Sequence, residues 1–412
     1  MVGIGRAAGY DPRMLAAHVA AWLALVWSAL LAWLAIGAVI RRRALDRRFA
    51  TRSVPIPAIS APATTPKALI MRPCAGHDPG LLDNLRSLAS ARSTLPLKVI
   101  MAVDDPDDLA RPAIEAALIE LRAAGIDASF ELVANRGPNR KASILAGLLE
   151  RHPEPGIVVN IDSNVDLSGF DFDRLFAPLL GDRSIGAIWV PWSERPPAGT
   201  PGLGSRASEA LLGGSLTAFP LLCGIYPQGL VGKFWAAPRA AIDRIDFGDL
   251  THYLGEDLEM ARRLRAIDLQ IEAASLLVRS PGQAPSFAAA IERFARWMLV
   301  VRGQKLPLSF SYPAFFFATP LVLVLAAIGA IARPELGLIA AGLALFARAT
   351  VTLAARHWSG RGLALGPALV DAVLADLVLG LAWLRAFGSR EVSWRGHRLR
   401  VERGGRLRAL DP

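Results

Sequence analysis

An uncharged apolar run near the N-terminus constrains the fold of this chain more than any other feature. The run Met14–Ile40 holds 27 residues, none of which carries a formal charge at neutral pH. As an α-helix it would be about 40 Å long, which exceeds the ~30 Å hydrocarbon core of a bilayer. A cleaved signal peptide would have a shorter apolar region and a small-residue cleavage pattern, which this sequence lacks. The run is therefore predicted to be a transmembrane signal anchor.

Arginines that follow the run predict its orientation. They are Arg41, Arg42, Arg43, Arg47 and Arg48. By the positive-inside rule they belong on the cytoplasmic face, so the N-terminus is expected outside. Residues 1–48 then form the anchor, and residues 49–66, which are rich in Pro, Ala, Ser and Thr, form a linker.

The overall composition agrees with a membrane protein. Hydrophobic residues make up 53% of the chain and charged residues 20%, against about 25% charged in soluble domains. The net charge of +10 suits anionic lipid headgroups or a phosphorylated substrate. No nucleic-acid-binding module is present, so no nucleic-acid partner is expected. The two cysteines, Cys74 and Cys223, have no zinc-site or CxxC spacing, which favours a reducing compartment.

Short apolar runs alternate with helix-like segments in the middle of the chain. This alternation predicts an α/β domain at 67–305 with a mostly parallel sheet, whose ligands bind at the carboxyl ends of the strands. The predicted strands are 67–71, 97–103, 156–161 and 186–190, and segments such as 78–90 and 110–125 are predicted helices.

Polar residues gather where these elements meet. Asp105, preceded by Asp104, follows one predicted strand and Asp162 follows another, although an aspartate there is often only a cap or turn residue. Lys141 opens a helix, where a cation opposes the helix dipole unless a bound phosphate offsets it; a solvated surface lysine is the alternative. Asp257 lies in the first turn of a later helix, a position that favours acids in any case.

Taken in order, these residues resemble a known family. Asp105, Asp162, Asp257 and the run 293–297 (RFARW) match the D, D, D, (Q/R)xxRW series of membrane-bound family 2 and family 21 glycosyltransferases. The chain looks most like the ceramide glucosyltransferase group. The supporting stretches are 72–85 (RPCAGHDPGLLDNL), 103–106 (VDDP), 139–141 (NRK), 162–164 (DSN) and 255–261 (GEDLEMA).

The resemblance implies a GT-A type nucleotide-sugar-binding domain flanked by transmembrane helices, and a UDP-sugar as donor. Asp105 would contact the nucleoside, and Lys141 would lie near the base and diphosphate. Asp162 would hold Mg²⁺ or Mn²⁺ beside the diphosphate. This sequence departs from the DxD pattern, because Asn164 stands at its third position and leaves metal dependence open.

The resemblance also implies roles on the acceptor side. Asp257 would be the general base for an inverting transfer. Arg296 would steady the donor diphosphate and Trp297 would wall the pocket, while Arg293 stands where relatives carry Gln or Arg. The segment 205–239 lacks charge through most of its length and is either a buried core segment or an interfacial segment at a lipid entrance.

The C-terminal third, 306–388, is predicted to be a transmembrane region of about three helices. The spanning segments are 313–332, 336–355 and 363–384. Arg348, Asp371 and Asp376 lie inside them and either pair between helices or contact the head of a lipid acceptor. The tail 389–412 carries a net charge of +4, which belongs in the cytoplasm, whereas three spans would place it outside. Either one segment is re-entrant or interfacial, or the N-terminal helix is the exception.

The predicted function is transfer of one sugar from a UDP-sugar to a membrane lipid, with ceramide or a sphingoid lipid as first acceptor. The enzyme would be integral to a bacterial inner membrane, with its catalytic domain in the cytoplasm. The alternatives are a hopanoid glycosyltransferase, a polysaccharide synthase and a catalytically inactive membrane scaffold. The sequence does not specify the sugar, the lipid or the oligomeric state.

Overall fold

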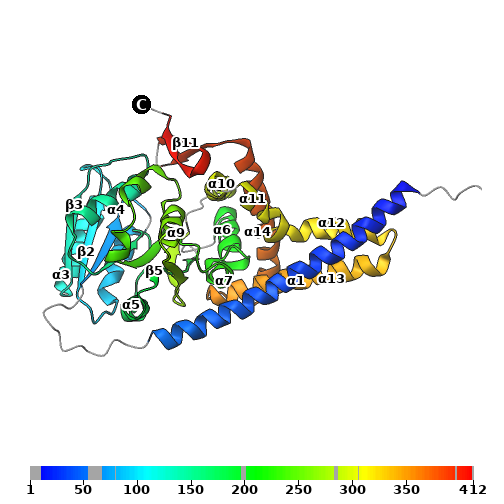
Figure 1. Ribbon diagram of the computed structural model, residues 1–412, viewed down its shortest axis with the longest axis horizontal. Coiled ribbons are helices and arrows are strands. Elements are labelled where there is room, and N and C mark those ends of the chain that lie inside the picture. Colours follow the sequence, from blue (N-terminus) through cyan, green and yellow to red (C-terminus); the bar gives the residue numbers. More distant parts are fainter. Residues whose placement is uncertain are drawn as a thin grey trace, which may run out of the picture.

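The chain divides into an α/β body and a helical arm that projects from it (Figure 1). The computed structural model describes residues 11–53, 67–78, 80–195, 201–282, 286–304, 306–394 and 397–410. Most of the predicted linker, residues 54–66, lies outside this described part, and the helix that precedes it continues to Arg52.

A seven-stranded sheet forms the centre of the body. Its strand order is β3-β2-β1-β4-β7-β5-β8. Strand β7 runs antiparallel to β4 and β5, and the other neighbours run parallel, which confirms the predicted mostly parallel sheet. The strands are β1 (Ala68–Pro73), β2 (Leu97–Val103), β3 (Asp127–Leu132), β4 (Ile157–Ile161), β5 (Ile185–Trp189), β7 (Phe234–Pro238) and β8 (Gln270–Ala273). Strands β1, β4 and β5 are buried along their whole length, as their continuous apolar runs require in a sheet covered on both faces.

Helices connect and cover these strands. In the first part of the body they are α2 (Leu81–Arg86), η1 (Ser87–Ser90), α3 (Arg111–Ala123), α4 (Arg140–Arg151) and α5 (Phe172–Gly181). In the second part they are α6 (Leu203–Gly214), α7 (Phe219–Ile225), α8 (Arg239–Ile242), η2 (Gly248–His252), α9 (Glu256–Ala266) and α10 (Phe287–Gln304). A pair of short strands, β6 (Trp192–Arg195) and β9 (Val278–Pro281), completes the body. Helices α6 and α7 are largely buried, which favours the core interpretation of the segment 205–239.

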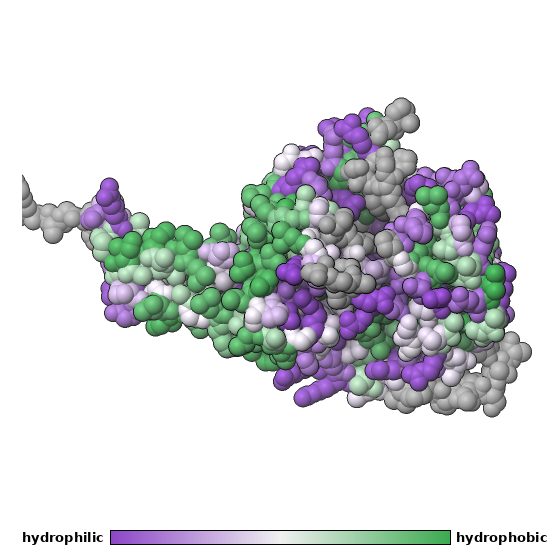
Figure 2. All heavy atoms as spheres, turned by 180° about the vertical axis from the view of Figure 1, so that it is seen from behind, coloured by the Kyte–Doolittle hydropathy of each residue, from purple (hydrophilic) through white to green (hydrophobic). Residues whose placement is uncertain are grey.

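The arm consists of three helices that lie side by side (Figure 1). They are α1 (Pro12–Arg52), α12 (Ala318–Ala330) and α13 (Pro334–Trp358). Small residues allow close approach: a methyl added to Gly329 of α12 would come within 2.5 Å of the Cα of Ala21 of α1. The face of the arm that Figure 2 shows is largely apolar, and the exposed residues of the arm include Trp33 and Leu338.

Several helices are long and apolar enough to cross a membrane. In the described ranges they are α1, the segment Leu203–Ile225, α13 and α14 (Leu365–Gly388). A further pair joins Leu306–Phe316 to Ala318–Ala330 across a bend of 62°, and it contains α11 (Leu306–Ser309) and the π-helical turn η3 (Tyr312–Phe316).

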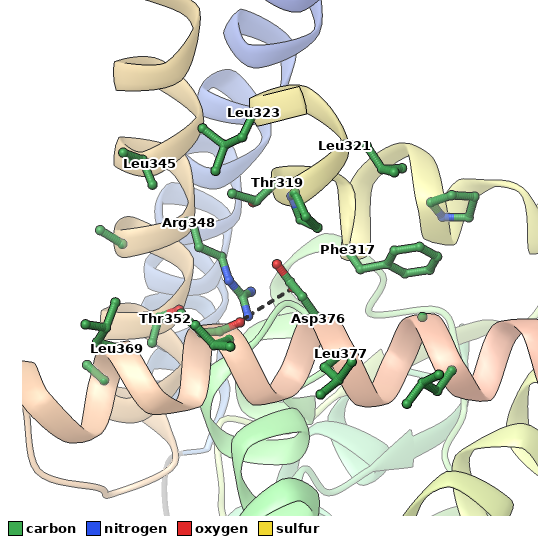
Figure 3. Close-up of a pocket in the computed structure, with 18 of the residues that line it drawn as sticks. Phe317, Thr319, Leu321, Leu323, Leu345, Arg348, Thr352, Leu369, Asp376 and Leu377 are labelled. Atoms are coloured by element: carbon green, nitrogen blue, oxygen red, sulfur yellow. Dashed lines mark hydrogen bonds and ion pairs between the residues drawn. The ribbon is translucent and has the colours of Figure 1, made fainter. Parts of the chain in front are cut away.

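Helix α14 takes a different course from the arm. It runs crosswise to the arm along the side of the body in Figure 1 and again in Figure 3. Its buried residues Ala375, Val378 and Leu379 belong to the hydrophobic core of the body. Its outer face exposes Leu365 and Leu369. The predicted span 363–384 is therefore a helix packed on the body and not a fourth helix of the arm.

The C-terminal tail folds back onto the body. Its three strands, β10 (Glu391–Trp394), β11 (His397–Val401) and β12 (Leu407–Ala409), form an antiparallel sheet. Arg406 pairs through its backbone with Tyr253, and its Nη2 lies 3.0 Å from Asp249 Oδ1. The basic tail therefore lies on the same side of the molecule as the α/β body.

Candidate active site

Two of the predicted aspartates follow parallel strands of the sheet. Asp105 comes after β2 and Asp162 after β4, with β1 between these strands. Since neighbouring strands are ~4.8 Å apart, the two strand ends are roughly 10 Å apart. Asp105 is exposed, and its Oδ1 accepts a hydrogen bond of 3.0 Å from the backbone N–H of Asp107. The preceding Asp104 is engaged with Arg140, whose Nη2 donates to Asp104 Oδ1 at 2.5 Å.

Lys141 is held inside the site and is not a solvated surface lysine. Asn139 caps α4 by accepting a hydrogen bond from the N–H of Ala142 at 3.0 Å, which places Lys141 in the first turn. Lys141 Nζ lies 2.8 Å from Asp162 Oδ1 and 3.3 Å from Glu256 Oε1. Burial acts to lower the pKa of Lys141, but these two carboxylates outweigh it and raise the pKa above its ordinary value.

Asp257 lies beside this cluster, in the first turn of α9. Its Oδ2 accepts a hydrogen bond from the N–H of Gly232 at 2.6 Å, and its Oδ1 accepts one from the N–H of Leu258 at 2.8 Å. Burial, and then the charge of Glu256, raise the pKa of Asp257 to about 7. A carboxylate with this pKa can accept a proton near neutral pH, as a general base must.

The contact between Asp257 and Gly232 requires glycine. A Cβ at position 232 would come within 3.0 Å of Asp257 Oδ2. The carbonyl of Gly232 also accepts a hydrogen bond of 2.6 Å from Lys141 Nζ. One backbone segment therefore holds both Asp257 and Lys141.

Glu256 and Asn139 join the two helix starts that carry these groups. Asn139 Nδ2 donates to Glu256 Oε2 at 3.0 Å and to the carbonyl of Tyr253 at 2.8 Å. Since Asn139 caps α4 and Glu256 begins α9, the bond fixes Lys141 relative to Asp257. Glu256 is therefore a positioning residue.

Lys233 is a second cation in the site, which sequence reasoning missed. Its Nζ donates to Asn164 Oδ1 at 2.8 Å and to Ser280 Oγ at 2.9 Å, and it lies 4.2 Å from the centre of the Trp192 ring. Burial lowers the pKa of Lys233 to about 8. The signal in the sequence was a single lysine directly before the buried strand β7.

Arg72 positions the loop that carries Asp162, and it too was missed. This arginine at the end of β1 is fully buried. Its Nη2 donates to the carbonyls of Asp162 at 3.1 Å, Ser163 at 3.2 Å and Val165 at 2.9 Å. Burial lowers the pKa of Arg72 to about 10. The buried guanidinium thus satisfies the loop's carbonyl groups and fixes its course.

Helix α10 carries the RFARW run and contributes a wall of aromatic rings. The Trp297 ring lies 6.4 Å from that of Trp192 and 5.7 Å from that of Phe219, between centroids. Arg293 is buried, forms an ion pair with Glu194 and lies 5.4 Å from the Trp297 ring centre. Arg293 and Trp297 therefore belong to the same aromatic wall as Trp192, whose ring lies next to Lys233.

Arg296 lines a cavity next to this aromatic wall. The cavity has a volume of about 450 Å³ and is formed by α10, the end of α14 and β10, with Arg293, Arg296, Arg385 and Glu391 among its lining residues. The structure thus joins Asp162, Lys141 and Asp257 in one cluster, and Arg293 and Trp297 in another.

The site can hold a divalent cation only with help from a ligand. Within the described ranges, no group of three or more His, Cys, Asp or Glu side chains is arranged to bind a metal. Asn164 is engaged by Lys233, and Asp166 by Arg195 at 3.1 Å. Asp162 Oδ1, however, is a buried carboxylate oxygen whose charged neighbour is Lys141 Nζ, 2.8 Å away. It fits Mg²⁺ or Mn²⁺, provided that substrate phosphates supply further oxygens.

Comparison with known proteins identifies the family. The sequence profile of glycosyl transferase family 21 matches residues 14–407. This chain belongs to glycosyl transferase family 21. The mostly parallel sheet of the body agrees with the α/β domain that the sequence predicts. None of the curated proteins matches the family 21 chain.

Solved structures with a similar fold have low sequence identity to this family 21 protein. A mannosyltransferase from Pyrobaculum calidifontis, in complex with GDP-Man and Mn²⁺, is 16% identical, with 88% of this chain and 99% of that chain covered and a TM-score of 0.48. Glucosyl-3-phosphoglycerate synthase from Mycobacterium tuberculosis, with Mg²⁺ and UDP, is 17% identical, with 57% and 78% covered and a TM-score of 0.32. TarS from S. aureus, with UDP-GlcNAc, is 11% identical, with 84% and 99% covered and a TM-score of 0.36.

Proposed function

We propose that this family 21 enzyme transfers one sugar from a UDP-sugar to a hydroxyl group of a membrane lipid, with inversion at the anomeric carbon. The observation that carries the proposal is the carboxylate of Asp257, whose pKa is raised to about 7, beside the cation Lys141 and the half-buried Asp162. These groups combine a base with a binding place for a leaving diphosphate.

On the donor side, the nucleoside extends from Asp105 toward Asp162, across the roughly 10 Å between the two strand ends. Lys141 and Lys233 face the diphosphate and reduce its negative charge. Asp162 would hold Mg²⁺ or Mn²⁺, which when bound supplies further positive charge to the leaving group. Arg296 is proposed as an additional contact of the diphosphate.

On the acceptor side, Asp257 removes the proton of the acceptor hydroxyl while that oxygen attacks the anomeric carbon. The bond from this carbon to the diphosphate oxygen breaks, and UDP leaves with the electron pair. A single displacement inverts the configuration, so a UDP-α-sugar yields a β-glycoside. Trp297 and Arg293 form the wall beside the acceptor.

The proposed topology uses three membrane spans, which are α1, α13 and the bent pair of Leu306–Phe316 with α12. The N-terminus lies outside, and the body lies in the cytoplasm of a bacterial cell, at the inner membrane. Helix α14 lies at the cytoplasmic interface, with its inner face in the core of the body and its exposed apolar face, which includes Leu369, toward the bilayer. This course places the basic C-terminal tail in the cytoplasm and removes the conflict with the positive-inside rule.

The first proposed acceptor is ceramide or a sphingoid lipid, and a hopanoid polyol is the alternative. The test incubates the purified full-length protein with UDP-sugars and either lipid, and identifies products by mass spectrometry. Asp257→Asn should abolish transfer, whereas Asp243→Asn, at an exposed site of the same domain, should not. Equal UDP release by the wild type and Asp257→Asn would contradict the proposal.

A further inference from the structure

A groove opens in the corner where the arm meets α14. Its volume is about 1110 Å³, and α12, α13, α14 and the turn η3 form its walls (Figure 3). The groove exists because the helical segment before α12 bends away by 62°, so that α12 and α14 separate at this point. Phe317 and Trp383 line it and also pack with the core of the body, which Trp297 contacts as well. The groove therefore borders the catalytic domain.

The walls of the groove suit hydrocarbon. Leucine, valine, alanine, proline and aromatic side chains make up most of the lining. Leu369, at its rim, is 69% exposed, and Leu345 and Leu321 are exposed beside it. In the proposed topology these side chains face the bilayer, so lipid chains reach the groove without crossing water. Its volume exceeds that of most small-molecule sites, which span roughly 300–1,000 Å³.

Polar groups in the groove lack partners. Figure 3 shows Arg348 and Asp376 pointing toward each other across it, with Thr352 beside them. Arg348 Nη2 donates to the carbonyl of Ala372 at 2.6 Å and lies 3.1 Å from Asp376 Oδ1. Yet Arg348 Nε and Thr352 Oγ1 are buried and form no hydrogen bond with the described residues, while Asp376 Oδ1, also buried, is engaged by Arg348 Nη2. Thr352 is only 2% exposed and Arg348 8%, and unpaired polar groups at membrane depth are costly.

A neighbouring ion pair shows that this arrangement is not needed to join the helices. Asp371 of α14 binds both Arg356 and Arg361, and the latter also reaches Glu209 of α6. That cluster already ties α13, α14 and the body together. The Arg348–Asp376 pair faces the groove instead, and Arg348 Nε and the Thr352 hydroxyl beside it form no hydrogen bond with the described residues.

The charge of the site selects its ligand. Arg348 and Asp376 together are neutral, so neither a phosphate nor an amine gains a net attraction. A neutral hydroxyl or amide group can accept hydrogen bonds from Arg348 Nε and from the Thr352 hydroxyl, and it can donate one to Asp376. Such a group on a hydrocarbon chain contacts all three side chains at once.

We propose that the groove binds the acceptor lipid, with its hydrocarbon along α12 and α14 and a neutral hydroxyl or amide group at Arg348, Thr352 and Asp376. This inference rests on the proposed function, since it assigns a binding place to that reaction's acceptor. It excludes bulk phospholipid as the preferred occupant.

The kinetic test compares two threonine variants of the full-length protein, with UDP-glucose and ceramide as substrates. Thr352→Val removes the hydroxyl at nearly constant volume and should raise KM for ceramide roughly threefold to tenfold, the effect of one lost hydrogen bond. The KM for UDP-glucose should not follow it. Thr350→Val, two residues away and not in the groove lining, should leave both values unchanged. An unchanged KM for ceramide in Thr352→Val would overturn the proposal.

The direct test uses a ceramide with a diazirine in its acyl chain and a phosphatidylcholine labelled in the same way. The proposal expects the ceramide probe to label residues of the groove, unlabelled ceramide to compete, and Asp376→Asn to reduce the labelling. Equal labelling by phosphatidylcholine without competition would overturn it. If the wild type glycosylated no lipid, the proposed function would fail first; transfer with an unaltered labelling pattern in Asp376→Asn would refute the groove alone.

Discussion

Two clusters of buried charge lie in this molecule, and they are balanced differently. At the edge of the sheet, the carboxylates of Asp162, Glu256 and Asp257 surround Lys141, and Lys233 is a second cation beside them. Between α13 and α14, three arginines face Asp371, Asp376 and Glu209. The first cluster has more carboxylates than cations, and the second has equal numbers.

The difference indicates what each cluster does. An excess of carboxylates in one buried place raises a pKa, as at Asp257, and leaves room for the positive charge of a metal or a reacting group. A balanced cluster among apolar helices needs no further charge, so it joins helices and accepts only neutral ligands. The same residue types thus serve chemistry in the body and assembly at the membrane.

Removing the cation of the first cluster should have the largest effect. Lys141→Met leaves three carboxylates together and takes away a group that faces the diphosphate, so kcat/KM should fall about 10²–10³-fold. The measurement is UDP release at varied donor concentration. Lys67→Met, at an exposed position before β1, should retain wild-type activity. A loss below about threefold would mean that the two clusters do not differ in function.

Removing a carboxylate from the second cluster should lower the free energy of unfolding and leave the catalytic step unchanged. Asp371→Asn leaves the buried Arg356 without its carboxylate and leaves Arg361 with Glu209 alone, which should cost about 3 kcal/mol of unfolding free energy and lower the melting temperature in detergent. Glu292→Gln is the matched control, because it breaks the exposed pair of Glu292 with Arg385 of α14. That change should cost about 0.5 kcal/mol or less. Equal melting temperatures for both variants would contradict the assignment.

The pH dependence of kcat/KM tests whether the excess of carboxylates raises the pKa of Asp257. Asp257 acts as a base only when deprotonated, so kcat/KM should fall about tenfold per pH unit below pH 7, where its pKa lies. Glu256→Gln removes a negative neighbour that raises this pKa, and the acidic limb should then move to lower pH. The limb is read from initial rates between about pH 5 and pH 9. A limb that stays in place would show that Glu256 does not set the pKa of Asp257.

The sequence predicted the sheet well, because its strands are short apolar runs that can be recognised from composition. The run 97–103 forms β2 with the predicted bounds, and the other three predicted strands begin or end within a few residues of β1, β4 and β5. Aspartates directly after these runs had to reach the same edge of a parallel sheet. Lys141 joined them because its helix begins at that edge.

The course of α14 was not predictable in the same way. Helices α13 and α14 have 25 and 24 residues, are similarly apolar and contain ionisable groups. What separates them is the partner on the inner face: α13 packs with α1 and α12, and α14 packs with α6 and α10. Such partners exist only in the folded chain. The sequence left open that one of the three segments lies at the membrane interface. The positive charge of the tail indicated this, because three spans would have placed the tail outside the cell.

Lys233 and Arg72 illustrate a second limit. Each stands next to apolar residues, and each acquires its role from loops far away in the chain, Ser280 for Lys233 and Val165 for Arg72. Spacing along one sequence cannot report such contacts. The run 293–297 is the opposite case, in which spacing along the sequence is enough. Arg293 and Trp297 are four residues apart on one helix and therefore lie on the same face.

The position of α14 has a consequence for which lipids can react. In the proposed topology, this helix would hold the body at one height relative to the bilayer, because it belongs to the core of the body and also crosses the base of the arm. The Asp257 carboxylate would then stand at a fixed height above the hydrocarbon. An acceptor would have to bring its hydroxyl to that height, so the proposed enzyme would select lipids by the length between their chains and their reactive oxygen.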